Sequence, residues 1–123
     1  MKIQSIRRGA HCIAVAESHA PVLNGTQAAV DLIMQAKYDA DSACLILPKS
    51  AVDDRFFILS SGLAGEILQK FVNYHAKLAV YGDFSGYTSK PLHDFIYECN
   101  EGQDFFFVST LEEAIERLVH AAD

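Results

Sequence analysis

Short apolar runs alternate along the chain with segments whose apolar residues recur every three or four positions. Three runs are almost continuously apolar, as expected of strands buried on both faces: CIAVAE at 12–17, ACLIL at 43–47 and LAVY at 78–81. DFFFVS at 104–109 is dense in aromatic and β-branched residues, which favour strands. The short mixed segment 2–8 precedes Gly9 and CIAVAE, so the chain is predicted to begin with an antiparallel pair.

Helical spacing follows each predicted strand after the first. The turn and cap residues at 24–26 begin a helix that is expected to end near Tyr38. A second helix is predicted from Gly62 onward. Its apolar positions form one stripe, made of Leu63, Ala64, Ile67, Leu68 and Phe71.

Two further helices are predicted near the end of the chain. One begins at Ser89, ends at Gly102, and has an expected buried stripe of Leu92, Phe95, Ile96 and Cys99. The last begins after Thr110, which forms a capping box with Glu113, and an ion pair between Glu113 and Arg117 is expected to support it. Its predicted stripe is Leu111, Ala114, Ile115 and Leu118.

The order of elements is therefore β-β-α-β-α-β-α-β-α. Because each later strand is followed by a helix, the connections are crossovers and the sheet is largely parallel. We predict a single α/β domain over residues 1–123, with a five-stranded, mainly parallel sheet, four flanking helices and the first strand antiparallel at or near an edge. The stretch 49–61 has no clear period, although Phe56, Phe57 and Ile58 are expected to be buried.

The block from Arg55 to Val108 resembles a bacterial family. The stretches that carry the resemblance are SSGLAGEILQKFVNY, LAVYGDFSGYTSKPLHDFI and ECNEG, and the family is catalogued as domain of unknown function 4180. The resemblance covers most of the chain. It supports an α/β fold and implies no particular activity.

The element order also resembles the STAS-like or SpoIIAA-like fold of the anti-sigma-factor antagonists. In those proteins an Asp-Ser-Ser-Gly-Leu stretch opens the second helix, and a partner kinase phosphorylates the second serine. Here Ser60-Ser61-Gly62-Leu63 opens the corresponding helix, with Leu59 in place of the aspartate. The resemblance implies a protein partner and makes Ser61 a candidate for phosphorylation. The alternative is that Ser60 or Ser61 is only the N-cap of the helix.

Charge and cysteine content narrow the function classes. Sixteen acidic and ten basic residues give a net charge of −6, and no basic cluster exceeds Arg7-Arg8. Nucleic acid and anionic membranes are therefore not expected as partners. No apolar stretch is long enough to span a membrane, and the first residues do not form a signal peptide. The three cysteines lack C-x-x-C spacing, so we expect reduced thiols and a cytoplasmic protein.

The loop that follows the LAVY strand is the most suggestive segment for a site. It leaves the carboxyl end of a predicted parallel strand, which is where open α/β sheets bind ligands. The candidate ligand- or partner-binding residues there, with one in the helix that follows, are Asp83, Ser85, Tyr87, Lys90 and His93. The alternative is that Asp83 and Ser89 only cap turn and helix N–H groups.

The spacing of residues gives little support for a metal site, a cofactor site or nucleophilic catalysis. The five histidines are scattered, so neither a metal nor a cofactor is expected, and no glycine pattern marks a nucleophilic serine. Cys99 lies beside Glu98 and Glu101, which disfavour a thiolate, so it is interpreted as a core residue rather than a reactive thiol.

Two functional hypotheses follow. The first is a non-enzymatic binding or regulatory module that holds a protein partner near Ser61 and Asp83. The alternative is a small enzyme acting on a small molecule in a cleft lined by Asp83, Tyr87, Lys90 and His93. A deep cleft with convergent polar groups would favour the enzyme, whereas a flat face would favour the module. A homo-oligomer is compatible with either hypothesis.

Overall fold

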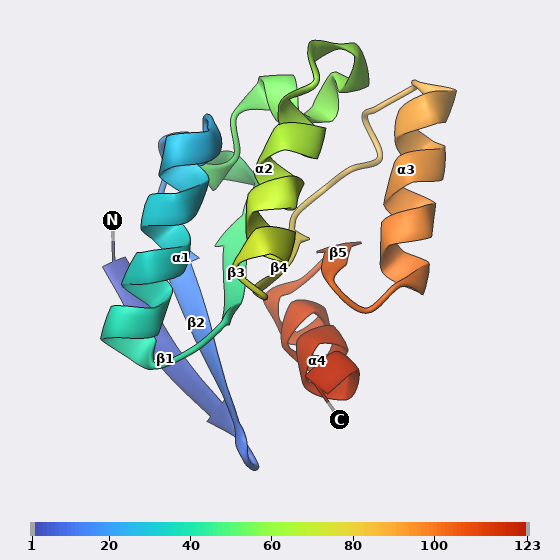
Figure 1. Ribbon diagram of the computed structural model, residues 1–123. Coiled ribbons are helices and arrows are strands. Elements are labelled where there is room, and N and C mark those ends of the chain that lie inside the picture. Colours follow the sequence, from blue (N-terminus) through green and yellow to red (C-terminus); the bar gives the residue numbers. More distant parts are fainter. Residues whose placement is uncertain (1, 123) are drawn as a thin grey trace.

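The computed structural model describes residues 2–122 and has one five-stranded sheet with four α-helices (Figure 1). The strands are β1 (Lys2–Arg8), β2 (His11–Glu17), β3 (Cys44–Pro48), β4 (Lys77–Tyr81) and β5 (Phe105–Val108). The helices are α1 (Thr26–Ala40), α2 (Leu63–Asn73), α3 (Lys90–Glu101) and α4 (Leu111–Ala122). The predicted order of elements is confirmed.

The strands lie in sequence order across the sheet, β1-β2-β3-β4-β5. β1 pairs antiparallel with β2, from Lys2 opposite Glu17 to Arg8 opposite His11. The remaining pairs are parallel. The predicted mixed sheet, with its antiparallel strand at one edge, is therefore confirmed.

Alternate residues of the strands face two separate apolar clusters, because successive strand side chains point to opposite faces. Leu45, Leu78 and Phe107 pack with α1, α2 and α3. Ile46 and Phe106 pack on the opposite face with α4. Figure 1 shows α1, α2 and α3 side by side along the sheet. Three helices thus cover one face and a single helix covers the other.

The stretch 49–61, which has no clear period in the sequence, contains three short 3₁₀ helices at Lys49–Ala51, Asp54–Phe57 and Leu59–Ser61. Phe56 and Phe57 are buried as predicted, but Ile58 is 55% exposed. The prediction for Ile58 was wrong because Ile58 lies in extended backbone between the second and third 3₁₀ helices, where its side chain does not continue the buried face of Phe56 and Phe57.

Two predictions for the last helices need correction. In α3 only Leu92 is fully buried, and Phe95, Ile96 and Cys99 are partly buried at the rim of the core. In α4 the guanidinium of Arg117 donates to the carbonyl of Asn100 at 2.9 Å and lies over the Phe106 ring, so it does not form the ion pair expected with Glu113. Both differences arise from tertiary contacts that helical spacing does not encode.

Thr110 caps α4 as predicted, since its hydroxyl accepts from the N–H of Glu113 at 3.1 Å. The Glu113 carboxylate accepts from the N–H of Ser109 at 3.4 Å, one residue before the expected capping-box partner. None of the helices in residues 2–122 is both long enough and apolar enough to cross a membrane.

Candidate functional site

The loop at 82–89 lies against the 3₁₀ segment at 57–61. The ring of Tyr87 stacks on Phe57 with a centroid distance of 5.3 Å, and Phe84 lies 5.7 Å from Phe57. These contacts join two segments that are separated by a helix and a strand in the sequence. The structure therefore brings Ser61 and the loop of Asp83 into one region of the molecule.

Asp83 organises the start of the loop. Its Oδ1 atom accepts from the N–H of Ser85 at 2.9 Å and from the Ser85 hydroxyl at 2.6 Å. The Ser85 hydroxyl, the Ser85 amide and the nearby charge of Lys49 hold the pKa of Asp83 below its usual range. The predicted turn-capping role of Asp83 is confirmed, and its carboxylate is charged at neutral pH.

Lys49 is a neighbour of this loop that sequence reasoning did not single out. It directly follows β3, and its ammonium lies 4.9 Å from the centre of the Tyr87 ring. The first carbons of its side chain pass close to Gly82 at the end of β4. Its position directly after β3 could have indicated this, because the carboxyl ends of the parallel strands β3 and β4 lie at the same edge of the sheet.

Lys90 and His93 belong to the first turns of α3, and each contacts a group other than Asp83. The Lys90 ammonium pairs with Asp94 at 2.8 Å, and both side chains are exposed. The Nε2 atom of His93 lies 2.6 Å from the carbonyl of Tyr87, to which it can donate. Ser89 caps α3 by accepting from the N–H of Leu92 at 3.3 Å. These groups hold the loop on the helix and do not converge with Asp83 on one point.

Ser61 is exposed just before α2. Its hydroxyl donates to the carbonyl of Arg55 at 2.7 Å and accepts from the N–H of Leu63 at 3.2 Å. The N-cap position itself is Gly62, with φ of 79°, so neither Ser60 nor Ser61 is the N-cap. Ser61 nevertheless satisfies the first N–H of the helix from one residue earlier.

Cys99 lies half-buried on α3. Burial, followed by the charge of Glu98, raises its pKa to about 11, which keeps the thiol protonated at neutral pH. Its interpretation as a core thiol is consistent with this environment. Within residues 2–122, no three His, Cys, Asp or Glu side chains are grouped so that they could hold a metal ion.

Residues 8–118 match a protein family described as Domain of unknown function (DUF4180). The chain belongs to this family. The match confirms the resemblance seen in the sequence and includes Ser61 and all candidate residues of the 83–93 region. No curated protein and no solved structure gives a significant match.

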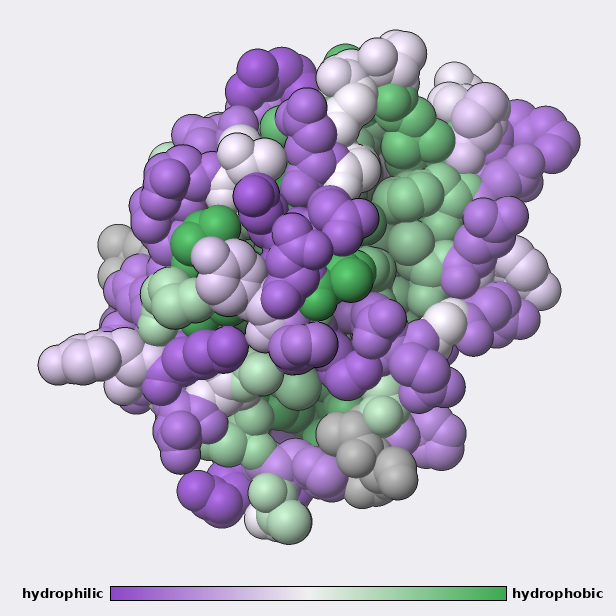
Figure 2. Space-filling model, viewed as in Figure 1, coloured by the Kyte–Doolittle hydropathy of each residue, from purple (hydrophilic) through white to green (hydrophobic). Residues whose placement is uncertain are grey.

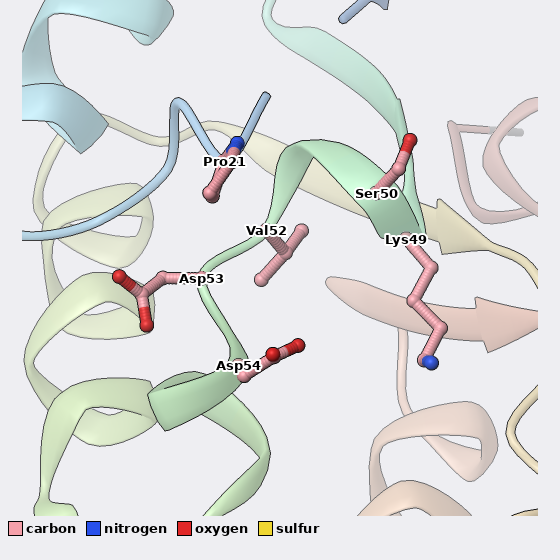
Figure 3. Close-up of a pocket in the computed structure, with 6 residues that line it drawn as sticks. All are labelled: Pro21, Lys49, Ser50, Val52, Asp53 and Asp54. Atoms are coloured by element: carbon pink, nitrogen blue, oxygen red, sulfur yellow. The ribbon is translucent and has the colours of Figure 1, made fainter. Parts of the chain in front are cut away.

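Three hollows in the surface of the protein lie around the candidate site. One, of about 530 Å³, is lined by Pro21, Lys49, Ser50, Val52, Asp53 and Asp54 (Figure 3). In the view of Figure 3, the carboxylates of Asp53 and Asp54 point in opposite directions. The Asp53 carboxylate is bound by the guanidinium of Arg55 at 3.0 Å. The charged groups of this hollow therefore do not converge.

The second hollow is an open groove of about 540 Å³ between the 3₁₀ segment and the start of α3. It is lined by Phe57, Ile58, Leu59, Ser60, Gly86, Tyr87, Thr88, Ser89, Pro91 and Leu92. Figure 2, in the same view as Figure 1, shows apolar side chains gathered in a hollow between α2 and α3. The third, of about 720 Å³, lies beyond the ends of β4 and β5.

Proposed function

We propose that the chain is a non-enzymatic binding and regulatory module that holds a protein partner on the surface formed by residues 57–61 and 83–89. The observation that carries this proposal is Ile58, which is 55% exposed at an open groove with largely apolar walls. Contiguous apolar surface rimmed by polar groups is typical of a site for another protein chain.

The lining of the groove suits an apolar segment of a partner. Phe57, Leu59, Tyr87 and Leu92 provide apolar contact area, and Ser60, Thr88 and Ser89 place hydroxyl groups among them. A polar rim around an apolar centre is the usual composition of a protein interface. The partner is therefore expected to insert one or two large apolar side chains beside Ile58.

The alternative function, a small enzyme acting in a cleft lined by Asp83, Tyr87, Lys90 and His93, has less support. General acid–base or nucleophilic catalysis needs groups that meet at one reacting atom. Asp83 accepts from Ser85, Lys90 pairs with Asp94, and His93 contacts the Tyr87 carbonyl. The polar groups of this region are thus engaged in holding the loop.

The module is proposed to be of STAS-like type and to work in the cytoplasm. Two features support the first part: the order of elements, with its antiparallel first pair, and the exposed Ser61 one residue before the N-cap of α2. The free thiols of Cys12, Cys44 and Cys99 support a reducing compartment.

Site-specific photo-crosslinking in the native host tests the partner surface. A photoreactive residue replaces Ile58 in one variant and Val72 in a matched control, because Val72 is a 48% exposed apolar residue on α2 outside the groove. We expect one protein to crosslink at position 58 and not at 72. The purified partner should then bind the wild-type chain and Val72→Asp, and bind Ile58→Asp at least tenfold more weakly.

Equal crosslinking at both positions, or a partner that binds Ile58→Asp as well as the wild type, would overturn the proposal. The same partner tests regulation at Ser61. If a negative charge there controls binding, Ser61→Asp changes the affinity and Ser61→Ala does not. If both variants bind equally and differ only in melting temperature, Ser61 has a structural role alone.

A further inference from the structure

The connections that follow β4 and β5 leave the sheet toward opposite faces. β4 leads into the loop before α3, which lies on the same face of the sheet as α1 and α2, whereas β5 leads into α4 on the other face. β4 and β5 are parallel neighbours. Among the parallel strands in residues 2–122, only this pair diverges in this way. Divergence opens a crevice beyond the carboxyl ends of two strands, where open α/β sheets bind ligands.

An open hollow of about 720 Å³ occupies this position, and its volume lies within the range of small-molecule sites. Its walls come from the ends of both strands, from the loop after β4, and from α3 and α4. The residues that line it are Tyr81, Gly82, Asp83, Phe84, Ser85, Ile96, Phe107, Val108, Ser109 and Glu113. This crevice is distinct from the groove beside Ile58.

The charged residues that line the crevice are all acidic. Asp83 and Glu113 contribute carboxylates, and the residues that line the crevice include no lysine, arginine or histidine. The hydrogen bonds from Ser85 and the charge of Lys49 lower the pKa of Asp83, so that carboxylate is ionised at neutral pH. The chain as a whole carries a net charge of −6, which also attracts cations.

The remaining lining offers aromatic and hydroxyl groups. The rings of Phe84 and Phe107 lie 6.0 Å apart at an angle of 88°, so their faces point in different directions. Aromatic faces attract cations and also bury apolar groups. The hydroxyls of Tyr81 and Ser109 can accept hydrogen bonds from a bound donor.

We propose that this crevice binds a small organic amine that carries an apolar or aromatic group. The ammonium group lies between the carboxylates of Asp83 and Glu113, and the apolar part packs on Phe84, Ile96 and Phe107. An anionic ligand would face two carboxylates, and the only cation whose charge reaches Asp83 among the described residues, Lys49, lies outside the lining over the Tyr87 ring, so an anion is expected to bind more weakly than an amine. This proposal does not rest on the protein partner proposed above, although Asp83, Phe84 and Ser85 belong to both surfaces.

Three probes of similar shape separate charge from apolar contact: 2-phenylethylamine, 2-phenylethanol and 3-phenylpropionate. Each is titrated into the ¹⁵N-labelled full chain at pH 7 and low salt, and amide shifts are followed by NMR. We expect the amine to shift amides at 82–85 and 108–113 to saturation. The alcohol is expected to bind about tenfold more weakly, and the acid should cause no saturating shift. Equal binding of all three probes, or shifts confined to other regions, would overturn the proposal.

Variants of α4 supply the matched control. Glu113→Gln removes a charge from the crevice and is expected to weaken binding of the amine about tenfold while binding of the alcohol stays unchanged. Glu112→Gln removes the same charge in the same helical turn, but Glu112 faces Arg8 at 3.5 Å and does not line the crevice. It should leave the affinity for the amine within twofold of the wild type. An equal loss in both variants would mean that only net charge matters, and the proposed site would be wrong.

Discussion

Gly82 shows how one residue fixes the edge of the sheet next to the candidate site. Its N–H still donates to the carbonyl of Val108 at 3.0 Å, so it continues the pairing of β4 with β5. A Cβ atom at this position would lie 2.7 Å from the Cβ of Lys49, and φ is 157°. The missing side chain lets Lys49 pass over the end of β4 and place its ammonium on the Tyr87 ring.

We therefore expect Gly82→Ala to lower the free energy of unfolding by about 1–3 kcal/mol, because the new methyl group displaces Lys49 or the loop. Gly65→Ala is the matched control, since Gly65 lies in α2 and a Cβ atom there would meet nothing within 4 Å apart from its chain neighbours and the backbone of its own helix. That change should stabilise the protein by about 0.5–1 kcal/mol. Urea denaturation followed by circular dichroism measures both, and a Gly82→Ala variant as stable as the wild type would contradict this explanation.

At the scale of elements, the last turn of α3 closes the outer edge of β5. The Asn100 amide donates to the carbonyl of Phe107 at 3.0 Å and accepts from the Phe107 N–H at 2.8 Å. One side chain thus makes the two hydrogen bonds that a neighbouring strand would make. This contact leaves the free edge of β5 partly protected, which limits pairing with another chain.

Asn100→Asp tests this closure and gives a result that depends on pH. An ionised aspartate cannot donate to the Phe107 carbonyl, so we expect the variant to lose about 2 kcal/mol of stability at pH 7. A protonated aspartate restores one donor and one acceptor, so folding raises its pKa above the unfolded value near 4. The stability lost by the variant should therefore shrink as pH falls toward 4 and grow as pH rises through the raised, folded-state pKa. Urea denaturation of both proteins at pH 4 and 7 measures the difference, and an equal difference at both pH values would contradict it.

The elements that the sequence predicted well are those with strong periodicity. The apolar runs of β2, β3 and β4 and the stripe of α2 are each determined by their own residues, so local pattern is sufficient. The segment at 49–61 was not predictable because 3₁₀ turns leave no such period, and Ile58 was misplaced for that reason.

Only the local part of the candidate site could be predicted, because local pattern carries no information on contacts between distant segments. The turn made by Asp83 and Ser85 is local, and the sequence indicated it as one of two interpretations. The approach of Lys49 to Tyr87 and the stacking of Phe57 on Tyr87 join distant segments. Such contacts depend on how helices and loops pack on the sheet, which no single segment determines.

At the scale of the whole molecule, the two apolar clusters share the same strands. Leu45 and Ile46 are neighbours in β3, yet one packs with α1, α2 and α3 and the other with α4. Loss of either cluster therefore exposes one face of every central strand. Because α4 covers its face without another helix, its packing affects the whole sheet rather than one corner of the molecule.

We accordingly expect the chain to unfold in one cooperative step even when α4 is weakened. Leu118 in α4 and Ile67 in α2 are both 0% exposed, one in each cluster. Replacing either by alanine should cost about 2–5 kcal/mol and lower the urea midpoint without changing the slope of the transition. Glu116→Ala is an exposed control on α4 and should stay within about 0.5 kcal/mol of the wild type. The transitions are followed by far-ultraviolet circular dichroism and by tyrosine fluorescence, and the two signals should coincide. An early partial loss of helical signal in Leu118→Ala alone would show instead that α4 unfolds separately from the sheet.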